Sequence, residues 1–349
     1  MIIGLIIILV AILTIPFLVK PVEHNLEAFL FFMGLAASAV AGIISVDLFS
    51  HIFHNKMLYF ITAAVLIAGL LFKFTVEKIR NGMSILSQKL NIPILMFLII
   101  VVLGLVSSVI TAIIASLVLV EVAQALPIER KYRVKFVIIA CFSIGLGAAL
   151  TPIGEPLATI VVSVLSEDFT FLIRSLGMFI IPGVIAMGLL GAVYVGTKAK
   201  VIDKAQLEKE ALEYHCSLEP DTYQTIFIRA GKIFLFVVAL ELLGAGFKPL
   251  INTYIIHLDS KALYWINMIS AVLDNATLAA AEVSPMMSDA QITAILMGLL
   301  VSGGMLIPGN IPNIVSACKM NIGSRDWAKL GVPLGLIILL IYFVILFVF

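Results

Sequence analysis

Carboxylate, amide and hydroxyl side chains stand beside helix-breaking residues in the middle of two long apolar stretches. The first is GAALTPIGEP, residues 147–156, in which Glu155 lies between a glycine and a proline. The second is SGGMLIPGNIPN, residues 302–313, in which Asn310 follows the glycine. Proline removes a backbone donor and clashes with the preceding turn, so a helix cannot run unbroken through either stretch. Non-helical backbone at membrane depth persists only inside protein or beside a watery cavity, so both stretches predict a binding site.

The composition of the chain is that of a membrane protein. Of its 349 residues, 62% are hydrophobic and only 12% are charged, whereas a soluble domain carries about 25% charged residues. We therefore predict an all-α polytopic membrane protein whose main partner is the lipid bilayer. The net charge of +1 says nothing about nucleic acid, and the sequence has no basic stripe with interleaved aromatic residues, so no nucleic-acid partner is expected. The three cysteines have no metal-ligand spacing, and no cofactor is expected.

Apolar spans follow one another along the whole chain. The run at residues 2–19 has neither the basic start nor the cleavage site of a signal peptide, so we predict it to be the first transmembrane helix. With the spans at 28–48 and 57–76 it forms an N-terminal group, residues 1–76. The remainder divides into a first core at 77–195 (hairpin 92–126, broken helix 134–165, helix 171–195), a linker at 196–225, and a second half at 226–349 (helix 226–245, hairpin 262–283, broken helix 291–320, helix 331–349).

The distribution of basic residues sets the expected topology. The run at 92–126 is too long for one crossing, since about 20 residues suffice. Basic residues flank it on both sides, at 78–89 and at 130–135. Cytoplasmic loops are rich in lysine and arginine, so the run is expected to enter and leave on the cytoplasmic side as a re-entrant hairpin. The same reasoning predicts a cytoplasmic linker at 196–225, an N-terminus outside, and a multi-pass protein of the cell membrane.

The two helix breaks belong to a longer internal similarity. When Gly154 is aligned with Gly309, LGAALTPIGEPLATIVVS matches VSGGMLIPGNIPNIVSAC, and Glu155 faces Asn310. Upstream, VSSVITAII (106–114) matches ISAVLDNAT (269–277), and Thr111 faces Asp274. Downstream, SLGMFIIPG (175–183) resembles KLGVPLGLI (329–337). The order hairpin, broken helix, closing helix thus occurs twice, and the charge argument makes the two halves inverted. Inverted repeats with paired broken helices are typical of secondary transporters, whose site lies near the membrane midplane.

The sequence SAVLDN followed by SGGMLIPGNIPN resembles the ion transporter superfamily, which contains arsenite-pump membrane subunits, NhaD-type sodium/proton antiporters and sodium/dicarboxylate carriers. LTPIGEP resembles the first-half motif of that superfamily, and the similarity covers residues 92–349. The chain looks most like a prokaryotic group described only as uncharacterised cation transporters. It departs from the NhaD and arsenite patterns where Thr111 replaces an aspartate and Glu155 stands near an expected asparagine.

The predicted ion site combines oxygen ligands from both halves. Na⁺ takes carboxylates, hydroxyls and carbonyls freed where a helix unwinds. We expect bound Na⁺ at Asp274, Asn275 and Glu155, and backbone turned toward the site by glycines. Helix N-termini after each break also favour an anion, so the architecture serves either sign. The predicted binding residues are Ser107, Ser108, Thr111, Thr151, Glu155, Ser270, Asp274, Asn275, Thr277, Ser302, Asn310 and Asn313, with Gly147, Gly154, Gly303, Gly304 and Gly309 at the breaks.

Three further acidic residues lie in apolar surroundings. Glu121 and Glu282 are near hairpin ends, where an interfacial position is expected, and Glu241 is left open. A central aspartate in a membrane helix costs about 2.5–3.5 kcal/mol, so Asp274 and Glu155 need partners.

Three classes of function are compatible with these patterns. The first is a cation (Na⁺)/H⁺ antiporter working by alternating access. The second is a Na⁺-coupled transporter of a small anion, a carboxylate or an oxyanion, including arsenite-type efflux. Two carboxylates and no lysine or arginine stand near the breaks, which favours the cation. An intramembrane enzyme is a remote third alternative, because no histidine neighbours a membrane serine and Asp274 is the only aspartate deep in a span. The chain is therefore not expected to be an enzyme, and a homodimer is left open.

Overall fold

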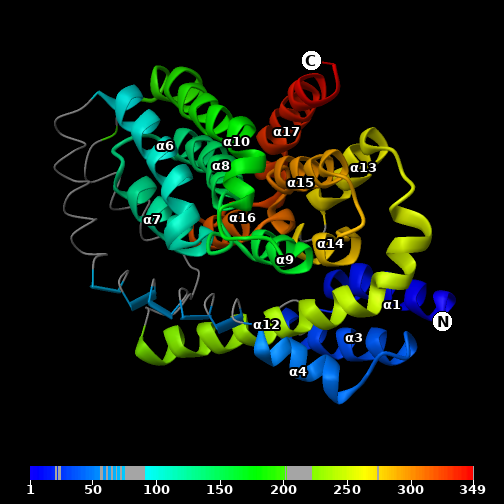
Figure 1. The fold of residues 1–349 in the computed structure, drawn as a ribbon. Coiled ribbons are helices and arrows are strands. Elements are labelled where there is room, and N and C mark those ends of the chain that lie inside the picture. Colours follow the sequence, from blue (N-terminus) through cyan, green and yellow to red (C-terminus); the bar gives the residue numbers. More distant parts are fainter. Residues whose placement is uncertain are drawn as a thin grey trace.

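The structure is a computed structural model that describes residues 1–19, 22, 25–55, short pieces between 58 and 74, 91–200, 202, 222–272 and 275–348. In these ranges the chain is built from helices, with no strand beyond an isolated bridge at residue 128. Figure 1 shows a lower layer of helices beneath a larger body, with the C-terminal helix projecting from the body. The predicted span at 57–76 lies in part, and the linker at 196–225 for the most part, outside the described residues.

Among the described residues, four helices with defined bounds form the lower layer. Helix α12 (Tyr223–Leu250), which continues into the π-turn η2 (Ile251–Ile255), packs along α3 (Leu26–Val40). Helix α1 (Ile2–Leu18) contacts both, and α4 (Val46–His54) follows α3. The Ser38 hydroxyl donates a hydrogen bond to the Leu242 carbonyl, 3.0 Å away, which fixes α3 against α12.

The second predicted span, at 28–48, was wrong in its extent. Helix α3 ends at Val40, and Gly42 adopts a left-handed φ of 72° that reverses the chain. A new, short helix then starts where the Ser45 hydroxyl accepts a hydrogen bond from the Leu48 amide at 3.1 Å. The glycine and the serine cap therefore divide the apolar run into two helices.

The body holds the two stretches identified from the sequence. Its helices are α6 (Ile92–Ile110), α7 (Ala112–Ala125), α8 (Arg130–Ala148), α9 (Pro156–Leu165), α10 (Phe171–Leu190) with the π-turn η1 (Gly191–Gly196), α13 (Ser260–Ile266), the 3₁₀-turn η3 (Asn267–Ala271), α14 (Asn275–Glu282), α15 (Asp289–Gly303), the 3₁₀-turn η4 (Ile307–Gly309), α16 (Ile311–Lys319) and α17 (Ser324–Phe347).

Three of the described helices are long and apolar enough to cross a bilayer: α6, α10 together with η1, and α17. Large apolar side chains are exposed on them, among them Val102, Met178 and Leu340. These features indicate a membrane protein. Two predicted helix starts were too late, because α8 begins at Arg130 rather than 134 and α17 at Ser324 rather than 331. Arginine and lysine are good helix formers, so these helices continue beyond their apolar parts.

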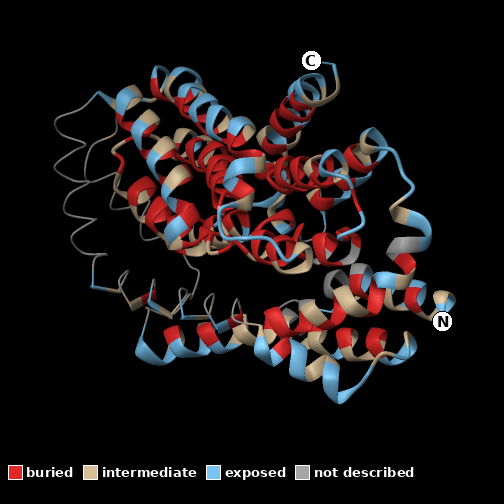
Figure 2. Cartoon of the chain, in the orientation of Figure 1, coloured by how far each residue is buried: buried red, intermediate tan, exposed pale blue. Residues whose placement is uncertain are grey.

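Helices α8 and α15 form the centre of the body. Every residue from 136 to 150 and from 294 to 305 is buried. Figure 2 shows this buried core surrounded by helices whose outward faces are exposed. The helix ends that lead into the two predicted breaks are therefore enclosed by protein, whereas Pro308 within the second break is exposed.

Candidate functional site

Both predicted breaks interrupt a helix, and they do so with the same backbone geometry. Helix α8 stops at the cap Ala149 (φ −72°, ψ −7°), and α15 stops at Gly304 (φ −73°, ψ −19°). The following half-helices begin after Glu155 (φ −153°, ψ 158°) and Asn310 (φ −154°, ψ 148°). Prolines occupy the first turn of both, where a missing amide hydrogen costs nothing. Glu155 and Asn310 are thus equivalent N-caps, and both are buried.

The first break is fastened to the junction between α6 and α7. The Ala112 amide donates a hydrogen bond to the Gly154 carbonyl at 2.8 Å, and the Thr151 hydroxyl donates to the Ser108 carbonyl. Thr111 forms the junction itself with φ 76° and ψ 149°, a conformation that glycine adopts far more readily than a β-branched residue. The Thr111 hydroxyl offsets part of this strain by accepting a long hydrogen bond, 3.4 Å, from the Ile114 amide at the start of α7.

Helices α6 and α8 approach closely because small residues line their contact. A side-chain carbon added to Gly147 would lie 1.8 Å from the Gly104 carbonyl oxygen. The Ser107 hydroxyl donates to the Ile144 carbonyl at 3.1 Å, and the Ser143 hydroxyl donates to the Ile100 carbonyl at 3.0 Å. Small residues with cross-helix hydrogen bonds are the usual means of helix association in lipid.

The second break is fastened to η3 by similar contacts. The Ser302 hydroxyl donates to the Asn267 carbonyl at 2.8 Å, and the Ser270 hydroxyl to the Leu299 carbonyl at 3.3 Å. A side-chain carbon on Gly309 would lie 2.6 Å from the Ser270 carbonyl oxygen. The break is also closed internally, because the Asn313 amide nitrogen donates to the carbonyls of Gly303 and Leu306, each at 2.8 Å.

The two sets of contacts follow the sequence alignment residue by residue. In that alignment Ser107 matches Ser270, and Ile144 matches Leu299. The Ser107 hydroxyl donates to the Ile144 carbonyl, and the Ser270 hydroxyl donates to the Leu299 carbonyl. Each break also approaches the end of its preceding helix: a side-chain carbon on Gly154 would lie 1.9 Å from the Ala148 carbonyl oxygen, and one on Gly309 would lie 2.6 Å from that of Gly303. The same local arrangement is therefore built twice from different sequences.

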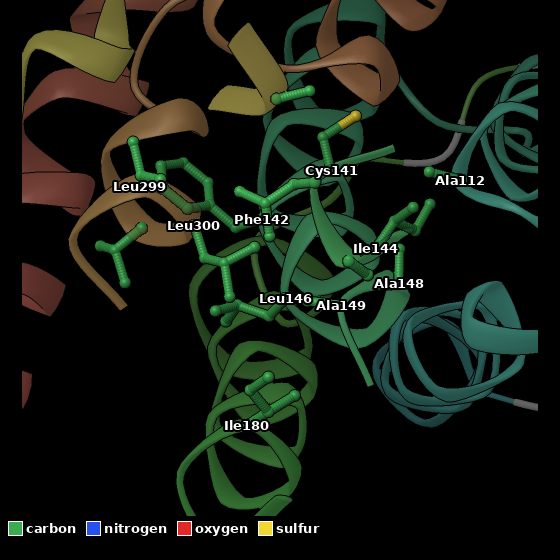
Figure 3. Close-up of a cluster of buried hydrophobic side chains, with 14 of the residues drawn as sticks. Ala112, Cys141, Phe142, Ile144, Leu146, Ala148, Ala149, Ile180, Leu299 and Leu300 are labelled. Atoms are coloured by element: carbon green, nitrogen blue, oxygen red, sulfur yellow. The ribbon is translucent and has the colours of Figure 1, made fainter. Parts of the chain in front are cut away.

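The two breaks lie against each other in the core. A side-chain carbon on Gly145 would lie 2.6 Å from the Asn310 amide nitrogen, and one on Gly304 would lie 2.4 Å from the Phe142 ring. Figure 3 shows Phe142 of α8 beside Leu299 and Leu300 of α15. Moreover, α7 packs against α16, and α14 packs against α9. Each half thus contributes one helix that packs on the post-break helix of the other half.

The predicted site residues fall into three groups. The residues of the two breaks and the residues that hydrogen-bond to them lie together in the core. Asp274 and the side chain of Thr277 lie outside the described residues, while Asn275 is the buried first residue of α14. The hydroxyls of Ser107, Ser108, Thr151, Ser270 and Ser302 all donate to backbone carbonyls. Those of Ser107, Thr151, Ser270 and Ser302 join separate elements, whereas the Ser108 bond lies within α6. A hydroxyl that donates one hydrogen bond still has lone pairs with which to accept a cation.

Three features of the site had no clear signal in the sequence. Thr159, in the first turn of α9, donates from its hydroxyl to the Pro152 carbonyl at 2.7 Å and so closes the first break. The oxygen of the Asn313 amide is buried and has no hydrogen-bonding partner among the described residues. The Trp327 ring nitrogen donates to the Gly304 carbonyl at 3.2 Å, so the last helix also holds the second break.

The other acidic residues differ from one another. The interfacial position expected for Glu282 was wrong, because its side chain is buried between α14 and η3 and accepts a hydrogen bond from Asn267. Glu241 on α12 accepts hydrogen bonds from the Ser163 hydroxyl and, at 2.8 Å, from the Asn55 amide, so it joins the lower layer to α9. Glu121 is half-buried on α7. The first half has no counterpart of this polar pair. In the alignment, Asn267 matches Gly104 and Glu282 matches Leu119, neither of which has a polar side chain.

Positive charge is kept away from the breaks. No lysine or arginine occurs in residues 136–165 or 289–318. Arg133 is buried near the start of α8, about 22 Å along the helix axis from Ala148. The Arg130 guanidinium donates to the Asn321 carbonyl at 2.8 Å, where it neutralises the C-terminal end of α16. The breaks therefore combine acidic and neutral oxygen groups, and the basic side chains of α8 and α16 lie at the ends of these helices that are remote from the breaks.

Comparison with known proteins places the chain in a family whose description states no function. No curated protein matches the chain. A family model described as "Protein of unknown function (DUF1646)" matches residues 2–349. Because this match spans nearly the whole sequence, the chain belongs to the DUF1646 family.

Proposed function

We propose that the protein is a secondary active cation transporter, a Na⁺/H⁺ antiporter that works by alternating access. The observation that carries this proposal is the pair of adjoining helix breaks, capped at equivalent positions by Glu155 and Asn310. Broken helices that meet inside a bundle provide half-helix ends and unwound carbonyls, the groups from which transporters build ion sites.

The proposal includes two inverted repeats, each with a re-entrant hairpin. Contacts at one end of the first pair of helices support the hairpin. A side-chain carbon on Gly196 would lie 2.6 Å from the Cα of Pro93, at the start of α6. Past the end of α7, the Ile202 amide donates to the Pro127 carbonyl at 3.0 Å, and the Glu129 amide donates to the Lys200 carbonyl at 3.0 Å. Both ends of the α6–α7 pair therefore contact the same short segment, 196–202, as expected if the pair enters and leaves on one side.

The packing between the halves supports a two-fold relation. Helix α7 contacts α16, and its counterpart α14 contacts α9, the counterpart of α16. An exchange of this kind is expected when two similar units face each other about a pseudo-two-fold axis. With the hairpins inverted, one half-site opens to each side of the membrane, which is the geometric requirement of alternating access.

The charge around the breaks favours a cation as the transported ion. Glu155 caps the first post-break helix, Asp274 precedes α14, and neither post-break helix contains a basic residue before Lys319. The Asn313 amide oxygen is buried without a hydrogen-bonding partner in the described part of the chain, which offers a hard acceptor to Na⁺. We assign Na⁺ binding to Glu155, Asp274, Asn275 and Asn313, together with hydroxyl and carbonyl oxygens at the two breaks.

One observation favours a second candidate, a Na⁺-coupled transporter of a small anion. The N-termini of α9 and α16 both begin at the breaks, and helix N-termini attract anions. However, the N-cap residue of α9 is Glu155, whose carboxylate repels an anion at close range. The anion transporter therefore requires Glu155 to be protonated during transport.

Transport by purified protein in liposomes tests the proposal. A pH-sensitive dye inside the vesicles reports proton movement when Na⁺, Li⁺ or K⁺ is added outside in turn. We expect Na⁺ to drive protons across the membrane, and we expect Asp274→Asn and Glu155→Gln each to abolish the response. Glu167→Gln is the matched control, because Glu167 is an exposed carboxylate in the loop after α9 and should leave transport unchanged.

The outcomes separate the two candidates. If no cation moves protons and Asp274→Asn retains Na⁺-dependent uptake of a carboxylate or arsenite, the antiporter proposal fails in favour of the anion transporter. If both neutral variants exchange Na⁺ for protons as the native protein does, the site assignment fails.

A further inference from the structure

The second half contains a buried polar pair that is separate from the helix breaks. Glu282, the last residue of α14, is 8% exposed, and Asn267, the first residue of η3, is fully buried. The Asn267 amide nitrogen donates to a Glu282 carboxylate oxygen at 2.8 Å and to the Leu263 carbonyl at 2.9 Å. Two oxygen acceptors, one of them a carboxylate, thus converge on a single amide group.

The hydrogen bonding of this pair is incomplete. The Asn267 side-chain oxygen is buried and has no partner among the described residues. Within the same ranges, Asn267 is also the only residue that hydrogen-bonds to Glu282. Burying an ionised carboxylate costs several kcal/mol unless a positive partner or several hydrogen bonds offset the cost. One amide donor does not meet this requirement.

We propose that Glu282 is the proton-binding carboxylate of the transporter, and that Asn267 holds it in place. This inference rests on the proposed antiporter function and names the group that carries the exchanged proton. A proton needs one oxygen, whereas Na⁺ needs several, and among the described residues the Asn267 amide nitrogen bonds to two oxygens, one of Glu282 and the carbonyl of Leu263. The chemistry of the pair therefore suits H⁺ rather than a metal cation.

A proton on Glu282 can reverse the direction of its hydrogen bond with Asn267. The amide of asparagine is nearly symmetrical in shape, so its oxygen and nitrogen can exchange places by rotation. After rotation, protonated Glu282 donates to the Asn267 side-chain oxygen, and the amide nitrogen no longer donates to Glu282 or Leu263. The two protonation states thus correspond to two orientations of one side chain.

The pair is connected to the second break. The Asn267 backbone carbonyl accepts the hydrogen bond from Ser302, in the last turn of α15 immediately before the break. A change at Glu282 therefore reaches the predicted Na⁺ site through Asn267 and Ser302. This provides a physical link between the proton and the ion for which it exchanges.

Among the described residues, no charged group is bonded to Glu282. The elements that pack against α14 are α9, α12, α15, η2 and η3. The titratable or charged residues of these elements are Glu155 at the start of α9, Tyr223, Arg229, Lys232, Glu241 and Lys248 on α12, Tyr254 on η2, and Asp289 on α15; η3 has none.

The experiment separates proton coupling from Na⁺ binding. Native protein, Glu282→Gln and the control Glu167→Gln are reconstituted in liposomes. Na⁺-driven proton movement is followed with the dye, and exchange of radiolabelled Na⁺ for unlabelled Na⁺ is followed in parallel across a range of pH. We expect Glu282→Gln to lose proton movement down to the level of protein-free liposomes, while Na⁺/Na⁺ exchange continues and no longer depends on pH. Asn267→Ala should keep proton coupling but move its pH profile toward alkaline pH, because it removes the hydrogen bond that the ionised form accepts from Asn267.

Infrared spectroscopy gives a second readout that needs no transport. One component of the carbonyl band of protonated carboxyl groups should appear as the pH is lowered in native protein and in Glu167→Gln and should be missing in Glu282→Gln, whereas the remaining carboxyl groups absorb in all three proteins. If Glu282→Gln does not fold, Glu282→Asp is measured instead, and the band should shift in frequency.

The results distinguish this inference from the proposed function. If Glu282→Gln moves protons in response to Na⁺ with the native pH profile, or if the infrared band is the same in both proteins, Glu282 does not carry the proton and the antiporter proposal stands. If native protein moves no protons with any cation, the antiporter proposal fails, and the infrared band alone decides whether Glu282 binds a proton.

Discussion

The two halves of the protein join their helices at equivalent places by different means. In the first half, Gly104 and Gly147 let two backbones meet directly. At the aligned positions of the second half, Asn267 and Ser302 are joined by a hydrogen bond. The first contact depends on the absence of side chains, and the second depends on a polar pair that also reaches a buried carboxylate. The comparison suggests that the first half is the more rigid unit and that the second carries the chemistry that can change with conditions.

The largest effect is expected from filling the glycine contact. In Gly147→Leu the new side chain would collide with the Gly104 backbone, which cannot move aside as a flexible side chain can. We expect a loss of more than about 3 kcal/mol of stability, or failure to accumulate. Thermal unfolding of the purified protein in detergent measures the effect. Gly231→Ala is the matched control, since nothing lies within 4 Å of a side-chain carbon added there; a native-like Gly147→Leu would show that the close contact is not needed.

A smaller effect is expected at the aligned position of the second half. Ser302→Ala removes the hydroxyl that donates to the Asn267 carbonyl and leaves the helix path unchanged. The expected cost is about 1 kcal/mol, the usual value for one hydrogen bond between membrane helices. If Ser302→Ala lowers the unfolding temperature as much as Gly147→Leu does, the second contact does not depend on a single hydrogen bond.

Relief of backbone strain at Thr111 is expected to raise the stability of the protein, whereas the two preceding substitutions lower it. Thr111→Gly removes a side chain from a backbone conformation that costs about 1–3 kcal/mol in residues other than glycine. The variant also loses the weak cap to the Ile114 amide, so a net gain of about 1 kcal/mol is expected in thermal unfolding. A loss of stability would show that the hydroxyl contributes more than the backbone strain costs.

The smallest effect is expected in the exposed loop between α9 and α10, outside both contacts. The hydroxyl and amide of Thr170, and then Arg174, hold the pKa of Asp168 below its ordinary value. A lowered pKa in the folded state stabilises the protein above the carboxyl's ordinary pKa, and this contribution is lost as the pH falls through the folded-state value. Asp168→Asn should therefore lower the unfolding temperature slightly at neutral pH and not at all in strong acid. A larger difference in acid than at neutral pH would contradict this assignment.

The sequence predicted the helix breaks well because proline and glycine act locally. The backbone at 147–156 and 302–313 had few alternatives to leaving the helix, whatever surrounds it. The same local reasoning failed at residues 28–48, where one glycine and one serine cap divide an apolar run that looked continuous. It also failed for Glu282, because its burial depends on how α14 packs against η3, α9 and α12. A position near a hairpin end in the sequence can therefore still be buried by neighbouring helices.

The hydrogen bond from the Ala112 amide to the Gly154 carbonyl belongs to no side chain. An alanine scan cannot test this bond, because residue 112 is already alanine and an alanine at position 154 would itself collide with the Ala148 carbonyl. Only a change that removes the amide hydrogen itself, such as Ala112→Pro, would expose the link. Slow hydrogen exchange at the Ala112 amide would then be its signature in the unmodified protein.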